Sequence, residues 1–275
     1  MNKRKLTRII QFTLFTLLAI IMIVPFLWAV GVSLQGPGQA YNTPPTIFQP
    51  PFRFENYVEV LSKYDFGRYF LNTLTICIIN MIGVVLSNSM IAFGFAKFES
   101  KGLNALFFIG LCTMYVPAVT MMVPSYTLWN KLGALDTFVP LTLGSFFGAI
   151  SWIFLMRQNF KSLPNSFYEA AYMDGANPFY IYWKIYMPLC KPIIATLILR
   201  QFMGDWNNLQ GPLIYITSKE KYTAALAMSA LGADAYGRVE IEMAGAVIMM
   251  IPVIIVYLLA QRHFIGGIAD AGVKG

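Results

Sequence analysis

Long apolar runs separated by short polar stretches dominate the chain. Six of these runs approach the roughly 20 apolar residues that an α-helix needs to cross a bilayer. They are Ile9–Ser33, Tyr69–Ala96, Leu103–Val123, Phe138–Met156, Ile193–Ile216 and Met243–Gln261. The pattern predicts an all-α membrane protein whose six transmembrane helices form a single domain over residues 1–275.

The composition supports this prediction. Of 275 residues, 57% are hydrophobic and only 12% are charged, whereas a soluble globular chain carries about 25% charged residues. The mean hydropathy is +0.59. Because so few charged side chains cannot solvate the surface of a water-soluble fold, the net charge of +7 does not indicate nucleic-acid binding.

The first apolar run differs from a signal peptide. It follows the basic residues Lys3, Arg4 and Lys5, but a signal peptide has an apolar core of only about 7–15 residues. This run is long enough to span a bilayer, and no Ala-x-Ala site follows it. We expect an uncleaved first helix.

Lysine and arginine are unequally distributed between alternate loops. With the amino terminus placed in the cytoplasm, twelve of them fall in 1–8, 97–101, 157–192 and 262–275, and seven fall in the loops of the other side. The acidic residues show the opposite bias, with four inside and eight outside. Cytoplasmic loops carry an excess of basic residues, so we expect both termini in the cytoplasm.

The cytoplasmic loop 157–192 has a pattern typical of two short helices. Ser166 and Glu169 fit a capping box at a helix start. Gly175 permits the positive φ that ends a helix, and Asn177 with Pro178 can cap and start the next one. The sequence thus predicts a helix, a glycine turn and a second helix. Such a hairpin is either an interfacial loop without a partner or a helix shaped for docking into a groove on another protein.

The residues of this loop resemble the EAA loop of ABC importer permeases. The match consists of Glu169, Ala170, Ala171, Asp174, Gly175 and Ala176, followed by Ile185, Pro188 and Leu189. Further motifs are similar to the maltose-type carbohydrate-uptake branch, and most closely to its smaller permease subunit: Phe54-x-Asn56-Tyr57, Asn72-Thr73, Trp206-Asn207 and the tail Gln261–Gly275. The resemblance covers nearly the whole chain and implies a permease domain over residues 1–275.

The resemblance implies a permease subunit of an ATP-driven importer of sugars or oligosaccharides in the cell membrane of a prokaryote. Residues Glu169–Ala176 would be the coupling helix seated in a cytoplasmic ATPase dimer, which would hold ATP and Mg²⁺, and the tail 262–275 would reach the same ATPase. A second homologous permease subunit would complete the pore. An extracytoplasmic sugar-binding protein would contact the outside loop Thr217–Glu242.

Polar residues interrupt the fifth apolar run. Asp205, Trp206, Asn207 and Asn208 lie near its middle, where polar groups are costly and usually face the bundle interior or a water-filled path. One interpretation is a break that lines the sugar path, with Trp206 stacking and Asn207 hydrogen-bonding. The alternatives are helix–helix contacts with Asp205 paired to Arg200, or a proton relay in an ion- or proton-coupled secondary transporter.

The sequence lacks the patterns of a catalytic or metal site. Cys77, Cys112 and Cys190 have no metal-ligand spacing, and His263 has no second ligand nearby. The phosphate-binding pattern Gly-x-x-x-x-Gly-Lys-Ser/Thr does not occur, and no nucleophile–base set is readable. We therefore expect a non-catalytic subunit that itself binds no metal or cofactor. A membrane scaffold without transport activity would share these absences.

The charge distribution generates a topology prediction. We expect residues near Tyr57, Lys131 and Lys221 outside the cell and those near Lys101, Glu169 and Lys274 in the cytoplasm. Single cysteines at these positions, probed with a membrane-impermeant thiol reagent in intact cells, should be labelled only in the first set. Labelling of a cysteine at position 169 from outside would overturn the topology.

Overall fold

The computed structural model describes residues 3–44 and 46–272, and every regular element in these ranges is a helix. Of the tail 262–275, it describes only the backbone of the last helix as far as Gly272, so the expected contact of this tail with an ATPase lies outside the described residues. Contacts divide the chain into two compact units, which are 1–68 with 227–252 and 69–226 with 253–275. The single permease domain over 1–275 stays a prediction.

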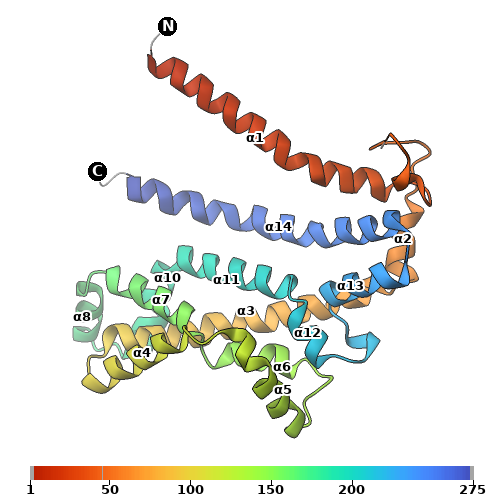
Figure 1. The fold of residues 1–275 in the computed structure, drawn as a ribbon. Helices are drawn as coiled ribbons and strands as arrows, with labels where there is room; N and C mark the ends of the chain where they lie inside the picture. The colour runs from red at the N-terminus through yellow and green to blue at the C-terminus, as the bar shows by residue number, and fades with distance from the viewer. Residues whose placement is uncertain (1–2, 45, 273–275) are drawn as a thin grey trace. The chain divides into compact units, whose positions relative to one another are not determined.

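The first unit is built on two long helices. It contains α1 (Lys3–Ser33), η1 (Gln39–Tyr41), α2 (Glu55–Ser62), most of α13 (Ala224–Asp234) and the first part of α14 (Val239–Gly272). The four α-helices are labelled in Figure 1. Large apolar side chains cover α1 and are exposed along most of its length. A helix that is apolar all round belongs in a membrane or a large core, so this surface of α1 is suited to lipid or to another apolar helix.

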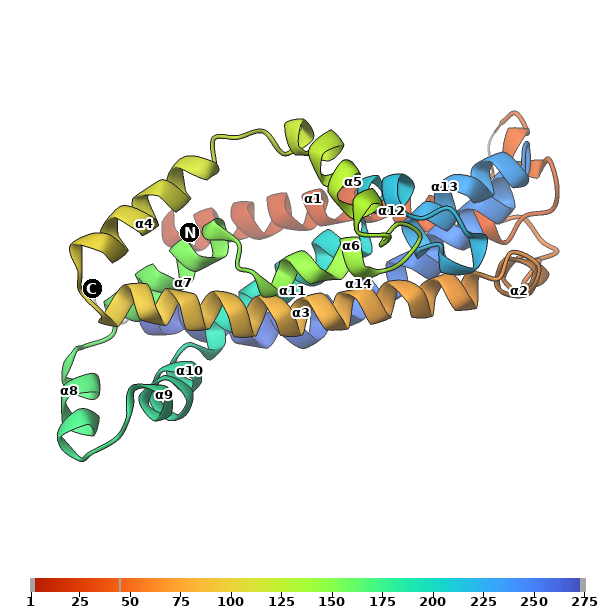
Figure 2. The same cartoon turned by 90° about the horizontal axis from the view of Figure 1, so that it is seen from below.

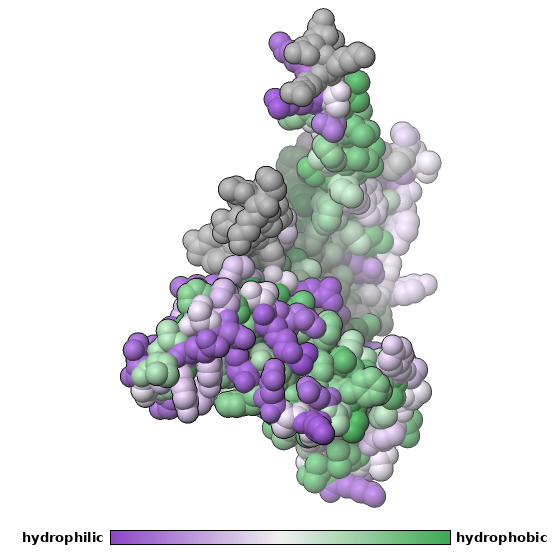
Figure 3. Space-filling model, turned by 90° about the vertical axis from the view of Figure 1, so that its left-hand side faces the viewer, coloured by the Kyte–Doolittle hydropathy of each residue, from purple (hydrophilic) through white to green (hydrophobic). Residues whose placement is uncertain are grey.

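The second unit is built around α3 (Phe66–Lys97). The elements that follow it are α4 (Lys101–Thr113), η2 (Ala118–Met121), α5 (Met122–Lys131), α6 (Val139–Thr142), η3 (Leu143–Phe146), α7 (Ile150–Ser162), α8 (Ser166–Met173), α9 (Pro178–Ile181), η4 (Tyr182–Tyr186), α10 (Met187–Leu189), α11 (Lys191–Trp206), α12 (Gln210–Tyr215) and η5 (Lys219–Lys221). Figure 2 shows α3 as one long helix, with α8, α9 and α10 gathered near its carboxyl-terminal end. Figure 3 shows that hydrophilic residues gather on the end of this unit that carries α8–α10.

The candidate spans agree only in part with the six predicted runs. Four stretches in the described residues are long and apolar enough to cross a membrane: Thr7–Ser33, Phe66–Lys97, Val139–Ser162 and Val239–Gln261. The third predicted run is a pair of helices, Lys101–Thr113 and Ala118–Lys131, bent by 96°. The fifth run is divided, because α11 ends at Trp206 and α12 begins at Gln210. The described chain thus has four such helices, or five if the bent pair counts as one span.

Polar side chains of α3 make the irregular stretch 139–150 possible. Asn80 Nδ2 donates to the Leu141 carbonyl at 3.0 Å, and Ser87 Oγ donates to the Ser145 carbonyl at 2.8 Å. Asn88 Oδ1 accepts from the backbone N–H of Ala149 at 2.6 Å. Since broken helices leave backbone groups that lipid cannot satisfy, these bonds fix the break against α3.

An acidic residue ties two loops of the second unit together. Asp136 has a φ of +57°, a conformation that Asp adopts more readily than most residues. Its carboxylate accepts hydrogen bonds from the backbone N–H groups of Thr217 and Ser218 at 3.0 and 2.9 Å, and it pairs with Lys221 at 3.0 Å. The hydrogen bonds from Ser218 and its neighbours hold the pKa of Asp136 well below its usual range.

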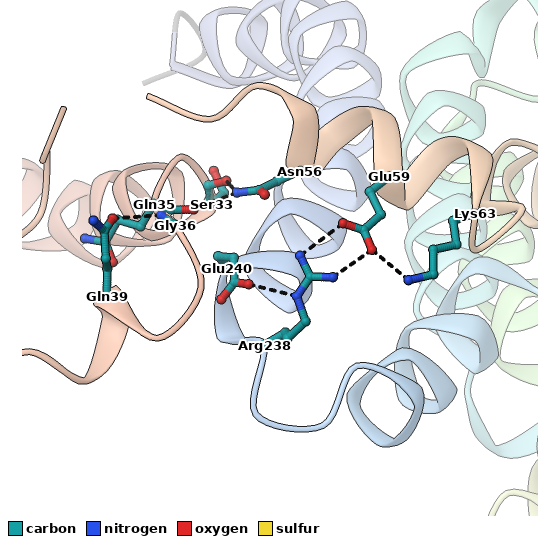
Figure 4. A network of polar contacts seen from close by, with 9 residues as sticks. All are labelled: Ser33, Gln35, Gly36, Gln39, Asn56, Glu59, Lys63, Arg238 and Glu240. Atoms are coloured by element: carbon teal, nitrogen blue, oxygen red, sulfur yellow. Dashed lines mark hydrogen bonds and ion pairs between the residues drawn. The ribbon is translucent and has the colours of Figure 1, made fainter. Parts of the chain in front are cut away.

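In the first unit, Asn56 of α2 satisfies the end of α1. Asn56 Nδ2 donates to the carbonyls of Ser33 and Gln35 at 2.8 and 2.9 Å. The Ser33 carbonyl is one of those that a helix end leaves without intrahelical partners, and Gln35 lies just beyond the end of α1. Asn56 is 3% exposed, and Figure 4 shows its amide beside Ser33. This contact gives a physical role to the Phe54-x-Asn56-Tyr57 motif.

Arg238 ties α2 to the start of α14. Its two terminal nitrogens bind the two oxygens of Glu59 at 2.7 and 3.0 Å, and its Nε donates to Glu240 at 3.0 Å, as drawn in Figure 4. Lys63 pairs with the same Glu59 carboxylate at 3.0 Å. The hydrogen bonds from Arg238 and Lys63 lower the pKa of Glu59 from 4.5 to about 2.

This network predicts a pH-dependent contribution to stability. Glu59→Gln removes the charge that Arg238 binds and should destabilise the detergent-solubilised protein by roughly 1.5–3 kcal/mol at pH 7, the range for hydrogen bonds to charged groups. A depressed pKa means that the contribution is complete above pH 4.5 and is lost as the pH falls toward 2. Unfolding temperatures of wild type and variant between pH 7 and pH 3 should therefore converge.

The matched control is Glu55→Gln, which changes an exposed acid in the same helix. We expect it to leave the unfolding temperature nearly unchanged at every pH. A gap between wild type and Glu59→Gln that stays constant down to pH 3 would show that the ionised carboxylate is not what stabilises this corner.

Candidate functional site: a helical hairpin and a broken helix

The hairpin formed by α8 and α9 turns at a glycine. Gly175 has a φ of +83°, which confirms the predicted positive φ. The Gly175 N–H donates to the Tyr172 carbonyl and the Ala176 N–H donates to the Ala171 carbonyl, each at 3.0 Å. These bonds satisfy carbonyls at the end of α8 in the manner of a glycine-terminated helix.

The second helix of the hairpin begins as the sequence predicts. Asn177 is its N-cap, and its Oδ1 accepts from the Tyr180 N–H at 2.8 Å. Pro178 occupies the first turn, where its missing N–H costs nothing. The chain then continues through one turn of π-helix, η4, which is a rare form that often occurs at functional sites.

The predicted capping box at the start of α8 is wrong. Ser166 is the first helical residue, and the N-cap residue is Asn165, whose side chain makes no capping bond. The Asn165 Oδ1 instead accepts a hydrogen bond from Lys97 Nζ at 2.9 Å. The amide that could cap α8 therefore binds the end of α3, a tertiary contact that local spacing did not reveal.

Most of the expected coupling residues lie at the surface of the hairpin. Glu169, Ala170, Asp174 and Gly175 are exposed, and Ala171 and Ala176 are half-buried. A groove of about 530 Å³ is lined by Ala171, Asp174, Gly175, Ala176, Asn177, Tyr180 and Ile185. Small side chains thus leave a hollow on the hairpin, while Glu169 and Ala170 lie outside the lining.

The predicted polar break lies at the junction of α11 and α12. Asn207 is exposed, and its Nδ2 donates to the Met203 carbonyl at 2.9 Å. Asn208 Oδ1 accepts from the Gly211 N–H at 3.0 Å and so satisfies the start of α12. Of the four residues expected here, Asn207 is the one that is exposed.

Trp206 and Asp205 are held by their own chain. Trp206 is 1% exposed, and its ring packs against Phe70 and Phe202 with centroids 4.9 and 5.5 Å apart. Asp205 accepts from Gln201 Nε2 at 2.9 Å. The alternative that paired Asp205 with Arg200 is wrong for this conformation, because Gln201, one residue further along the same helix, supplies the donor.

Sequence reasoning missed the residues of α3 that support the hairpin and the irregular stretch 139–150. Asn80, Ser87 and Asn88 satisfy the irregular stretch 139–150, and Lys97 binds the hairpin. The available signal was the recurrence of small polar residues within an otherwise apolar run. Such residues are costly in a membrane helix unless they find partners, so their presence alone marks a packed face.

Long apolar helices, a bent pair, a divided helix with polar groups and an exposed hairpin together define a multi-pass membrane protein of the transport type. Discontinuous helices whose polar groups face a cavity are characteristic of transporters. The chain belongs to the family of binding-protein-dependent transport system inner membrane components, whose family model matches residues 88–269.

Two individual relatives are permease proteins of transport or uptake systems. The arabinooligosaccharides transport system permease protein of Bacillus subtilis (strain 168) is 32% identical over 81% of this chain and 79% of the relative. The diacetylchitobiose uptake system permease protein of Streptomyces coelicolor is 29% identical over 95% of this chain and 87% of the relative. A bacterial ABC transporter involved in the import of the acidic polysaccharide alginate has a similar structure. It has a TM-score of 0.82 and 26% identity, covering 96% of this chain and 98% of that one.

Proposed function

We propose that this chain is the permease subunit of an ATP-driven importer of sugars or oligosaccharides, and that the α8–α9 hairpin couples it to a cytoplasmic ATPase. The observation that carries the coupling role is the exposed hairpin itself: a glycine turn at φ +83° beside a groove whose lining includes the small residues Ala171, Gly175 and Ala176. The relatives from Bacillus subtilis and Streptomyces coelicolor are permease proteins for arabinooligosaccharides and diacetylchitobiose, which supports the substrate class.

The proposal includes partners and a topology. An ATPase dimer would hold ATP and Mg²⁺ and receive Glu169–Ala176, a second homologous permease subunit would complete the pore, and an extracytoplasmic sugar-binding protein would meet the outside loop Thr217–Glu242. The divided pair α11 and α12 would be the sixth span, and both termini would lie in the cytoplasm of a prokaryote. This chain would itself hydrolyse no ATP.

The sugar path would pass the break between α11 and α12. Asn207, which is exposed, would donate or accept hydrogen bonds with sugar hydroxyls, while Asp205 and Asn208 would fix the break. Trp206 is buried in this conformation, so it would stack on a sugar only in a state that opens its packing against Phe70. Alternating access would supply such a state.

A secondary transporter driven by protons or sodium is the rival function, with Asp205 as the coupling group. Its only support is a half-buried carboxylate in a broken helix, and Gln201 already binds this carboxylate. Ionophores separate the two functions, since the importer should continue to work while ATP lasts.

The coupling role predicts the effect of two substitutions in the hairpin. A Cβ at Gly175 meets nothing within 4 Å, so Gly175→Val acts through the positive φ alone, at about 1–2 kcal/mol. Glu169→Lys places a cation in the first turn of α8, at the positive end of its dipole. Both variants should express at normal levels, lose sugar uptake, and co-purify with less ATPase or with an ATPase that hydrolyses without transport.

Two controls separate coupling from general damage. Gly175→Asn tolerates a positive φ and should retain most of the uptake that Gly175→Val loses. Ala19→Ser, in α1, should behave as the wild type. Normal uptake and normal ATPase recovery in both Gly175→Val and Glu169→Lys would mean that the hairpin is only a surface loop, and the coupling role would be withdrawn.

The low charge of the proposed sugar path predicts the substrate class. The candidate spans carry little charge, and the charged residues of the apolar run Ile193–Ile216 are Arg200 and Asp205. A neutral sugar or oligosaccharide therefore fits this path better than a polyanion. Uptake of a labelled panel should favour neutral oligosaccharides over an alginate oligosaccharide, the class imported by the structurally similar transporter. Transport of amino acids or inorganic ions alone would exclude the carbohydrate assignment.

A further inference from the structure

One stripe of α3 carries the contacts with the hairpin region. Ser89, Phe93 and Lys97 are spaced four residues apart, and residues at this spacing share one face of a helix. All three contact the segment that runs from α8 to η4. The last two turns of α3 thus form a continuous seat for this segment.

The packing between this end of α3 and the hairpin region is mainly aromatic. Phe93 is 4% exposed, and four rings surround it, with centroids 5.3–6.4 Å away: Phe160, Tyr168, Tyr182 and Tyr186. Tyr182 Oη and Ser89 Oγ share a hydrogen bond of 2.7 Å. Tyr182 and Tyr186 are the first and last residues of the π-helical turn η4, so this irregular turn is itself packed on α3.

Lys97 closes the stripe at its end. Its Nζ donates to Asn165 Oδ1 at 2.9 Å and lies 4.7 Å from the centre of the Tyr186 ring, within the range of a cation–π contact. One side chain of α3 therefore holds both the start of α8 and the end of η4. A displacement of the hairpin would change both contacts together.

The other end of α3 is bound to an outer segment. Asn72 Nδ2 donates to the carbonyls of Glu220 and Tyr222 at 2.9 and 3.0 Å, and Thr73 Oγ1 accepts from the Ala224 N–H at 2.7 Å. Thr73 is 1% exposed. The segment 220–224 therefore has three hydrogen bonds to the first turns of α3, and it lies within the outside loop Thr217–Glu242.

Between these two ends α3 is uninterrupted. Its 32 residues contain no proline and extend for about 48 Å at 1.5 Å per residue. In the same unit the α4–η2–α5 pair is bent by 96°, and the chain breaks between α11 and α12. Half of the span of α3 is buried, against 17% for Val139–Ser162. A straight, buried helix transmits displacement better than a bent or exposed one.

We propose that α3 transmits movement of the α8–α9 hairpin to the outer segment 220–224, with Ser89, Phe93 and Lys97 as positioning residues at one end and Asn72 and Thr73 at the other. The inference rests on the proposed function, because the hairpin must move with an ATPase for α3 to carry a signal. It adds a route by which the state of the ATPase reaches the outside surface that would meet a sugar-binding protein.

The test uses the complete transporter in proteoliposomes with its ATPase and binding protein. A single cysteine replaces the exposed Glu220, and Cys77, Cys112 and Cys190 are replaced. The rate of labelling by an impermeant maleimide is compared with and without trapping by ATP and vanadate. We expect trapping to change the rate in the parent protein, and Lys97→Met or Asn72→Ala to abolish this change and reduce sugar uptake while the ATPase still co-purifies.

Matched controls lie on the same surfaces. Lys101→Met removes an exposed lysine at the same end of the unit, and Thr75→Ala removes a hydroxyl that bonds only within α3, to Leu71. Both should retain the change in labelling and the uptake. Ser89→Ala and Tyr182→Phe both remove the hydrogen bond between Ser89 and Tyr182. Because Ser89→Ala also removes hydrogen bonds to carbonyls within α3, Tyr182→Phe is the smaller change and tests the inner end with less risk to folding.

The double variant Lys97→Met with Asn72→Ala distinguishes transmission from two local defects. If α3 carries one signal, the double variant loses no more uptake than the more affected single variant, whereas independent defects combine. The role of α3 would be overturned if both single variants kept normal uptake and a normal change in labelling while Gly175→Val still lost uptake or ATPase. That result would leave the coupling role of the hairpin intact. Normal uptake together with normal ATPase recovery in Gly175→Val and Glu169→Lys would instead remove the coupling role of the hairpin, on which this inference rests.

Discussion

The structure depends on the requirement that every backbone polar group in a bilayer finds its partner within the protein. Unbroken helices meet this requirement by themselves, but the stretch 139–150 and the junction of α11 and α12 do not. Side chains of α3 supply the partners for the first, through Asn80, Ser87 and Asn88. Asn208 supplies one for the second. The same polar residues that interrupt the apolar pattern are thus what permits the irregular backbone.

Irregular backbone has a functional consequence. A span built of short segments can change its shape at a break, whereas an uninterrupted helix moves as a unit. The second unit contains both kinds, and its hairpin is packed on the uninterrupted one through Phe93 and its aromatic neighbours. The exposed side of the hairpin keeps small residues and a groove. Tight packing on one side and a small-residue surface on the other suit an element that passes force between proteins.

Charged groups outside the candidate spans serve a different purpose. Asp136 holds the segment after α12, and Arg238 with Glu59 holds α2 to the start of α14. Both sets combine several hydrogen bonds with an ion pair, and both depress the pKa of the carboxyl. Networks of this kind fix loop geometry through charge-assisted hydrogen bonds, where an apolar core is not available.

The sequence by itself determined what depends on composition and local geometry. Apolar runs gave the helical membrane class, Gly175 gave the turn, and Asn177 with Pro178 gave the helix that follows, because a positive φ or a cap is decided within a few residues. It did not reveal the irregular stretch 139–150, which side chains of α3 hold in place. It also placed the cap of α8 at Ser166, whereas the N-cap residue is Asn165, whose side chain binds Lys97, 68 residues earlier in the chain. Those features depend on which distant group is nearest, and only the tertiary structure decides that.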